Sequence, residues 1–466
     1  MRNSPDTHRH HIILGPTRDL GLADALRVAH ESVVIDIDER CREDAVRGTE
    51  LLSRLSSSDS PVYGLTTGFG PLASHSATGR ENQLHLIAHL ATGTGPALPA
   101  HIVRLMMMDR LWTIGRGMSL ASEALIEGLN ATLDKDLIPY VPAFGSVGAS
   151  GDLTPLAHLA LAMSGSGRMR HLSETEFRPS REVLQEAKLS TQSFDGRDAL
   201  ALVNGTSASF ALLAESYDRI MDLFSLTLVS QAMMVTALDA PRAAYDERLH
   251  AARIHPGQRK IARAMRMLLE DAGAAPISNP AADFPQSSGH ERQLQAAYSF
   301  RCIPQILGPV LEDFGWCLDG LERELNAVTD NPVFDLAAGE AIHGGNFHAQ
   351  PLSHVADRLS LGMASLASLL DRQIARITDS RLSGGLPAFL SPKEIGINSG
   401  FMGAQVSATA LTAELSAQAQ KRYLLQSRST NGANQDVVSM STLAAWSLYS
   451  TPPRLELRHL RAVRQG

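Results

Sequence analysis

The sequence predicts a mainly α-helical protein, with a long helical bundle at its centre and an N-terminal α-rich region. Apolar residues recur at steps of three and four over long stretches, whereas alternating strand patterns are rare. Of the 466 residues, 44% are hydrophobic and 20% charged, the balance of a globular chain with a large core. A polar stretch at 170–195 interrupts the apolar pattern, so we expect the N-terminal region to cover 1–195 and the bundle 196–466.

Two short strands are expected near the N-terminus, at 12–14 and 33–35. Helical stripes follow in 101–133 and in 206–236, and in the second the apolar residues surround the helix, which predicts burial on most sides. The clearest stripe comprises Val355, Leu359, Met363, Leu366, Leu370 and Ile374. Between these helices, 271–290 is rich in Gly, Pro, Ser, Ala and Asn, which predicts a long loop, either a lid or a connector.

Composition excludes several classes of partner. A net charge of -7 gives no basic surface for nucleic acid. The cysteines (Cys41, Cys302 and Cys317) are too few and scattered for a disulfide framework or a cysteine zinc site. His8, His10 and His11 are interpreted as a solvated tail rather than metal ligands. With no secretory signal and no apolar run long enough to span a bilayer, we expect a cytoplasmic protein without metal or membrane partners.

Chemistry is concentrated in 145–155 (GSVGASGDLTP). Asp152 is expected to cap a helix in whose first turn Pro155 is tolerated. The spacing fits neither a nucleophile elbow, a phosphate-binding P-loop nor a dinucleotide fingerprint. Two interpretations remain: a glycine turn before a buried helix, or a self-processing tripeptide. In the second, the Gly151 nitrogen attacks the Ala149 carbonyl carbon, and loss of two waters, one from Ser150, leaves a ring electrophile.

GSVGASGDLTPLAH resembles the signature of the aromatic amino acid ammonia-lyase family, whose members act on histidine, phenylalanine or tyrosine. Further blocks of the chain resemble the family in order, spanning roughly 20–445: 62–71, 86–95, 199–208, 296–305, 324–334, 343–350, 397–406 and 431–440. The resemblance implies a helical bundle, an N-terminal region that carries the prosthetic-group loop, and a homotetramer with active sites shared between subunits. It also implies that Ala149, Ser150 and Gly151 form 4-methylideneimidazol-5-one (MIO) without an external cofactor.

The same resemblance assigns roles to other residues. Tyr63 matches the catalytic base. Because a phenol has a pKa of ~10, the site must lower that pKa or position the proton's route. Asn204 matches an asparagine beside the prosthetic group, where its amide would donate to the ring carbonyl. Arg301 matches the arginine that pairs with the substrate carboxylate, and Tyr298 a tyrosine near the amine. The remaining pocket positions are Gln295, Phe347, Asn434 and Gln435, and Ala296 replaces an aspartate usual in histidine-specific members.

His89 and Leu90 match the two positions that select the ring, and His-Leu is the pair of tyrosine-specific members. An apolar residue instead of His89 would leave a phenolic hydroxyl unpaired, at a cost of about 1–3 kcal/mol. Thr66 and the NQDVVS segment also differ from histidine-specific members. The expected reaction is L-tyrosine to trans-4-coumarate and ammonia.

Other functions remain open: a histidine or phenylalanine ammonia-lyase, an MIO-dependent 2,3-aminomutase, or a non-catalytic homologue. The last is suggested by the final segment, STPPRLELRHLRAVRQG, where we expect an atypical and shortened end to the bundle.

Overall fold

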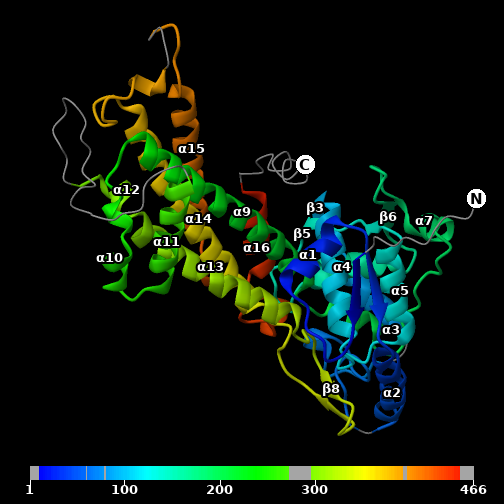
Figure 1. Ribbon diagram of the computed structural model, residues 1–466. Helices are drawn as coiled ribbons and strands as arrows, with labels where there is room; N and C mark the ends of the chain where they lie inside the picture. The colour runs from blue at the N-terminus through cyan, green and yellow to red at the C-terminus, as the bar shows by residue number, and fades with distance from the viewer. Residues whose placement is uncertain (1–9, 59, 78–79, 272–294, 392–395, 452–466) are drawn as a thin grey trace, which may run out of the picture. The chain divides into compact units, whose positions relative to one another are not determined.

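The computed structural model describes residues 10–58, 60–77, 80–271, 295–391 and 396–451 (Figure 1). The chain forms two compact units. Unit 1 comprises Met1–Glu215, Asp319–Ala356 and Arg422–Tyr449, and unit 2 comprises Ser216–Leu318, Asp357–Lys421 and Ser450–Gly466. Neither unit has a boundary at residue 195. The division into 1–195 and 196–466 stays a prediction. The final segment from 452 and most of the 271–290 loop lie outside the described residues.

Unit 1 combines helices with short strands. Its elements are β1 (His10–Leu14), α1 (Leu22–His30), β2 (Val33–Ile37), α2 (Glu39–Ser56), η1 (Gly70–Leu72), α3 (Arg80–Leu90), β3 (Thr94–Ala97), α4 (Ala100–Ile114), α5 (Glu123–Asp134), β4 (Leu137–Pro139), β5 (Pro142–Phe144), α6 (Leu153–Met163), β6 (Arg168–His171), β7 (Arg178–Pro179), α7 (Ser180–Glu186), α8 (Asp198–Val203), β8 (Val333–Asp335), β9 (Glu340–Ile342), η5 (Tyr423–Leu425), η6 (Asn431–Ala433) and α16 (Ser441–Ser450).

Long helices dominate unit 2, and three of them begin or end in unit 1: α9 (Ser207–Ala237), α13 (Ile303–Leu325) and α14 (Gln350–Thr378). The other elements are η2 (Arg242–Tyr245), α10 (Glu247–Ala251), α11 (Pro256–Asp271), α12 (Tyr298–Arg301), η4 (Ala388–Leu390) and α15 (Met402–Ala419). The predicted mainly α class is confirmed.

The strongest sequence patterns produce the expected elements. β1 and β2 form the two predicted N-terminal strands and pair in parallel, as the blue arrows in Figure 1 show. The stripe that begins at Val355 lies on α14, and its first four members are buried. The 101–133 stripe is two helices rather than one. α4 ends at Ile114, and α5 starts after Ser122, whose hydroxyl accepts the Leu125 N–H and caps it.

The polar stretch at 170–195 is folded within unit 1. It contains parts of β6, β7 and α7, and Met169, Val183 and Leu184 are buried with Leu137 in a small core. β6 pairs with both β4 and β7. These strands have two to four residues each, too few to show a clear alternating pattern in the sequence.

The core of unit 1 is helical, with α6 packed against both α3 and α8. The stretch 198–237 is long and apolar enough to cross a membrane by length and composition, so the expectation that no segment reaches that limit was wrong. Its first part, α8 and residues 207–215 of α9, is buried in unit 1. Burial in a protein core therefore accounts for the apolar composition of this part.

Candidate active site

A cavity of about 750 Å³ opens in unit 1 beside the turn that precedes α6. Its walls come from segments far apart in sequence: the 63–73 loop, α3, the end of α8, the segment after β9, and 431–437. Nine of the residues predicted to form the site line it: Tyr63, His89, Leu90, Ala149, Ser150, Asn204, Phe347, Asn434 and Gln435. The fold thus gathers most of the predicted site from one chain.

The Ala149-Ser150-Gly151 turn requires glycine for steric reasons. Gly151 has a φ of +66°, and a Cβ there would lie 2.2 Å from the carbonyl oxygen of Gly205. A Cβ on Gly148 would lie 2.3 Å from the hydroxyl oxygens of both Ser439 and Ser441. The tripeptide is therefore held between the start of α9 and the start of α16.

Asp152 occupies the predicted cap position, but its side chain does not cap α6. The buried carboxylate instead accepts the Ser209 N–H at 2.7 Å, the Ser209 hydroxyl at 2.9 Å and the Thr442 hydroxyl at 2.5 Å. The capping prediction was wrong because the first turn of α9, with its own unpaired N–H groups, lies within reach. Asp152 links the starts of α6, α9 and α16.

Ser150 has a well-defined partner in Gln435. The Gln435 amide donates to the Ser150 hydroxyl oxygen at 2.9 Å. Its own carbonyl oxygen accepts from the Thr430 hydroxyl at 2.7 Å and from the Asn431 amide at 2.8 Å, which fixes which end of the amide faces Ser150. Gln435, predicted only as a pocket position, therefore contacts the Ala149-Ser150-Gly151 turn directly.

Tyr63 is held at both ends. Its phenol oxygen accepts the Gly70 N–H at 2.8 Å, and its backbone N–H donates to His343 Nε2 at 3.1 Å. Burial raises the pKa of the phenol above its usual value, and the Gly70 hydrogen bond and the positive charge of Arg197 offset part of that rise. Of the two routes expected for a working base, the site therefore favours positioning over a lowered pKa.

Asn204 lies at the end of α8, where its amide nitrogen donates to Asp330 Oδ1 at 2.9 Å and to the Asn331 carbonyl at 3.2 Å. Its donation to a prosthetic-group carbonyl stays a prediction. Asp330 also forms an ion pair with Arg197, whose Nη1 lies 2.7 Å from Oδ2, and both side chains are fully buried. Sequence reasoning did not single out Arg197, Asp330 or His343. Asp330 and His343 lie in the matched 324–334 and 343–350 blocks, whereas Arg197 lies outside every matched block.

His89 lies on α3, and its Nδ1 lies 3.0 Å from the His85 carbonyl oxygen. A carbonyl accepts only, so Nδ1 carries the proton and, in the neutral ring, Nε2 is left as an acceptor. Leu90 follows at the end of the same helix. The pair therefore offers the cavity one hydrogen-bond acceptor and one apolar surface.

The other predicted residues do not line this cavity. Gly151 lies behind Ser150. Gln295, Tyr298 and Arg301 belong to unit 2, where the Arg301 guanidinium stacks 4.5 Å from the centre of the Tyr298 ring. Tyr298 is 70% exposed. Their predicted roles therefore rest on the sequence resemblance.

Buried carboxyl groups surround the first turn of α9. Besides Asp152, Glu324 accepts the Thr206 hydroxyl at 2.6 Å, and burial raises the pKa of both carboxyls. Burial also raises the pKa of Asp109 to about 8, and its Oδ1 has no hydrogen-bond partner among the described residues. The N-terminus of α9 carries a partial positive charge, which stabilises carboxyl groups buried near it, behind the cavity.

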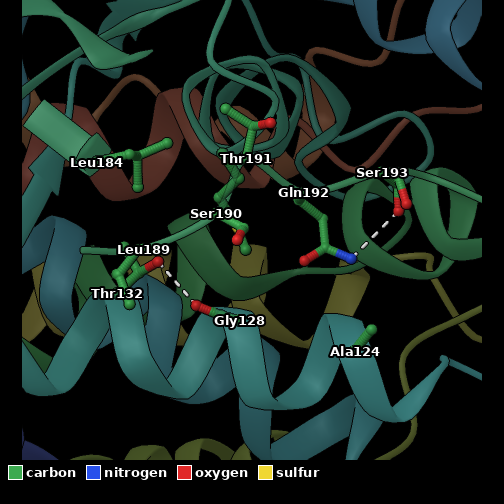
Figure 2. Close-up of a pocket in the computed structure, with 10 residues that line it drawn as sticks. Ala124, Gly128, Thr132, Leu184, Leu189, Ser190, Thr191, Gln192 and Ser193 are labelled. Carbon is green, nitrogen blue, oxygen red and sulfur yellow. Dashed lines mark hydrogen bonds between the residues drawn. The ribbon is translucent and has the colours of Figure 1, made fainter. Parts of the chain in front are cut away.

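A second cavity, of about 240 Å³, lies between α5 and the 189–193 segment (Figure 2). Its lining residues are Ala124, Gly128, Thr132, Met163, Leu184, Leu189, Ser190, Thr191, Gln192 and Ser193. None of these side chains is ionisable, so acid–base chemistry is confined to the first of these two cavities. Among the described residues, no cluster of His, Cys, Asp and Glu suits a metal ion.

Comparison with known proteins identifies the family of the chain. The family model for aromatic amino acid lyases matches residues 20–456. The chain is 42% identical to a tyrosine ammonia-lyase of Cereibacter sphaeroides over 87% of this chain and 78% of that protein, and 37% identical to a histidine ammonia-lyase of Burkholderia pseudomallei over 94% and 84%.

Among solved structures, the phenylalanine aminomutase of Pantoea agglomerans superposes with a TM-score of 0.88 at 29% identity, covering 95% of this chain and 86% of that one. The fold, the family model and the identities agree. The chain belongs to the aromatic amino acid lyase family and is a carbon–nitrogen lyase.

Proposed function

We propose that this lyase converts L-tyrosine to trans-4-coumarate and ammonia, using MIO formed from Ala149, Ser150 and Gly151. The observation that carries the proposal is the single cavity lined by Tyr63, His89 and Ser150. A base, a hydrogen-bond acceptor for a phenol and the reactive tripeptide share its walls.

The local backbone fits the ring. The chain bends sharply at Ser150, so that Ala149 and Gly151 pair across it. Cyclisation joins the Gly151 nitrogen to the Ala149 carbonyl carbon and releases two waters, the second carrying the Ser150 oxygen. Gln435, which donates to that oxygen, is placed to assist its departure. When formed, the ring supplies an electrophile that engages the substrate amine and makes ammonia a better leaving group.

Tyr63 is proposed to take the β-proton. The C–H electron pair becomes the new double bond, the C–N bond breaks, and the nitrogen leaves as ammonia. The Gly70 N–H, 2.8 Å from the phenol oxygen, stabilises the phenolate that must exist before proton transfer. Because Gly70 holds the phenol oxygen and His343 holds the backbone N–H of the same residue, little reorganisation is needed at the moment of transfer.

His89 supports the choice of tyrosine. With its Nδ1 proton bound to the His85 carbonyl, the free Nε2 lone pair suits a hydroxyl donor. Phenylalanine would leave that acceptor unpaired. The NQDVVS segment lacks the Asn-Gln-Glu-Asp-His run that gives histidine-specific members a carboxylate for the imidazole.

We further propose a homotetramer in which a second copy supplies Arg301 and Tyr298. Two observations support this. Arg301 does not line the cavity formed within one chain, although a substrate carboxylate needs a cation. α15 has a single buried residue, Ala419, and the rest of the helix is exposed or half-buried, yet Glu414 is its only charged residue. Such a helix needs an apolar partner, and a closed tetramer of identical chains provides one.

The test is product identification from purified protein given tyrosine, phenylalanine and histidine separately. Coumarate from tyrosine is expected to form fastest. Faster release of urocanate from histidine would overturn the tyrosine assignment while leaving the lyase class intact.

A 2,3-aminomutase is the second candidate, favoured by the structural likeness to a phenylalanine aminomutase. It returns ammonia to the β-carbon, and the β-amino acid lacks the cinnamate chromophore. Chromatography of the same reactions separates the two outcomes.

A further inference from the structure

His343 lies where a β-hairpin meets the cavity. β8 and β9 pair antiparallel, with Val333 opposite Ile342, so that His343 follows the last paired residue of β9. The Asn331 side-chain oxygen accepts the Gly344 N–H at 2.7 Å, which ties the two ends of the hairpin together. The imidazole of His343 lines the cavity.

The base of this hairpin is anchored in the core. Asp330 is held by both Nη atoms of Arg197, at 2.7 and 3.1 Å. Arg197 also donates to the carbonyls of Ser119 and Asn331. A buried, bidentate ion pair with further hydrogen bonds is a rigid attachment. The position of His343 is therefore set by hydrogen bonds to the buried Arg197 at the base of the hairpin, rather than by a surface loop.

The contact with Tyr63 specifies the state of the imidazole. Because the Tyr63 backbone N–H donates to Nε2, the lone pair of that nitrogen is the acceptor and the proton of the neutral ring lies on Nδ1. The phenol of the same residue accepts from Gly70, seven positions along the chain. His343 and Gly70 thus restrain Tyr63 at opposite ends.

We propose that His343 is a positioning residue, whose neutral imidazole holds the Tyr63 backbone and thereby places the phenol oxygen for proton transfer. The inference rests on the proposed role of Tyr63 as the base. A displacement of about 1 Å at a reacting group can cost about 100-fold in rate. The printed hydrogen bond of the His343 side chain is to the Tyr63 backbone, so its loss is expected to affect turnover rather than substrate binding.

The test compares three substitutions at His343. Gln places an amide oxygen near the position of Nε2, Asn places it near Nδ1, and Leu offers no acceptor. We expect H343L and H343N to lower kcat by about 10- to 100-fold with KM within about twofold, and H343Q to stay within about threefold of the parent. The near-ultraviolet absorbance and the loss of two waters at 149–151 are expected to be unchanged in all three.

A purely structural role would not alter the isotope effect. With tyrosine deuterated at the β-carbon, the kinetic isotope effect on kcat is expected to rise in H343L and H343N and to return in H343Q, because slower proton transfer then limits turnover. An unchanged kcat in H343L, failure of glutamine to rescue, or equal losses in kcat and substrate affinity would overturn the inference. If the parent protein itself forms no coumarate, the proposed function fails instead.

Discussion

At the scale of single residues, the site depends on which atom of each side chain is left free. His89 donates its Nδ1 proton to the His85 carbonyl, which leaves Nε2 as an acceptor for the cavity. The side-chain oxygen of Gln435 accepts from Thr430 and Asn431, so its amide nitrogen is the group that donates to Ser150. In both cases a neighbour outside the reaction determines the polarity that the substrate or the tripeptide meets.

His89→Phe is expected to shift the preference from tyrosine towards phenylalanine. Losing the proposed hydrogen-bond partner of a buried phenol costs about 1–3 kcal/mol, so the ratio of kcat/KM values should change by about 10- to 100-fold. Steady-state kinetics with both substrates measure it. His85→Phe is the matched control, since His85 lies one turn earlier on α3, outside the cavity, and contacts His89 through its backbone carbonyl, while its exposed side chain lies 3.5 Å from Glu81. An unchanged ratio in His89→Phe would remove the proposed role.

Gly151→Ala is expected to abolish both the near-ultraviolet absorbance and activity. The added Cβ meets the Gly205 carbonyl at 2.2 Å, and neither backbone can move away easily. Gly384→Ala is the control: its φ is +69°, and a Cβ there has nothing within 4 Å. It carries the left-handed strain, about 1–2 kcal/mol, without the clash. Full absorbance in Gly151→Ala would show that the tripeptide tolerates a side chain.

Sequence reasoning identified the residues of the cavity better than their contacts. Tyr63, His89 and Ser150 lie in recognisable blocks, and the structure brings them to one cavity. Asp152 was assigned to its own helix, whereas its partners are on α9 and α16. His343 was part of a matched block without a role, because a side-chain bond to a backbone N–H 280 residues away leaves no local pattern.

At the scale of elements, the start of α9 organises the region behind the cavity. Three carboxyl groups, from α4, α13 and the residue before α6, are buried around it, and each has a raised pKa. Short strands and this convergence were not predictable, because two- to four-residue strands have too few positions for a period to appear. The long helices were predictable, since α14 repeats its stripe over many turns.

The raised pKa of Asp109, about 8, predicts a pH-dependent stability. The folded state holds this proton more tightly than the unfolded state, so its contribution is complete below about pH 4 and is lost as the pH rises through 8. The slope is at most about 1.4 kcal/mol per pH unit. The melting temperature of the parent should therefore fall more between pH 6 and pH 9 than that of Asp109→Asn, which has no proton to lose. Parallel pH profiles would contradict the assignment.

At the scale of the whole molecule, function is proposed to require several copies of the chain. The exposed, almost uncharged α15 and the absence of Arg301 from the cavity within one chain lead to the same conclusion. Ser150→Ala lacks the electrophile, and Arg301→Ala lacks the carboxylate partner, so each is expected to be inactive alone. Coexpressed, they should regain activity, because random assembly builds about a quarter of the sites from two intact contributions. Coexpression without any recovery would mean that each chain completes its own site.

Val406→Glu is expected to prevent this assembly, as size-exclusion chromatography with light scattering would show. Val406 is 67% exposed on α15, where a buried charge is costly. Val46→Glu is the control, because Val46 is 53% exposed on α2 among charged neighbours. A tetramer that survives Val406→Glu would place the interface elsewhere.

The attachment of the Ala149-Ser150-Gly151 turn to the start of α16 has a consequence for biosynthesis. The hydrogen bonds from Gln435 to Ser150, from Thr442 to Asp152 and from Ser439 to the Gly148 carbonyl span 285 to 291 residues of sequence. A ribosome that has translated only the first two thirds of the message has not yet made these partners. We therefore expect Ser150 to remain an ordinary serine at that stage. The proposed electrophile is expected to form only after residues 435–442 have been synthesised, when the cavity walls from 431–437 are also in place.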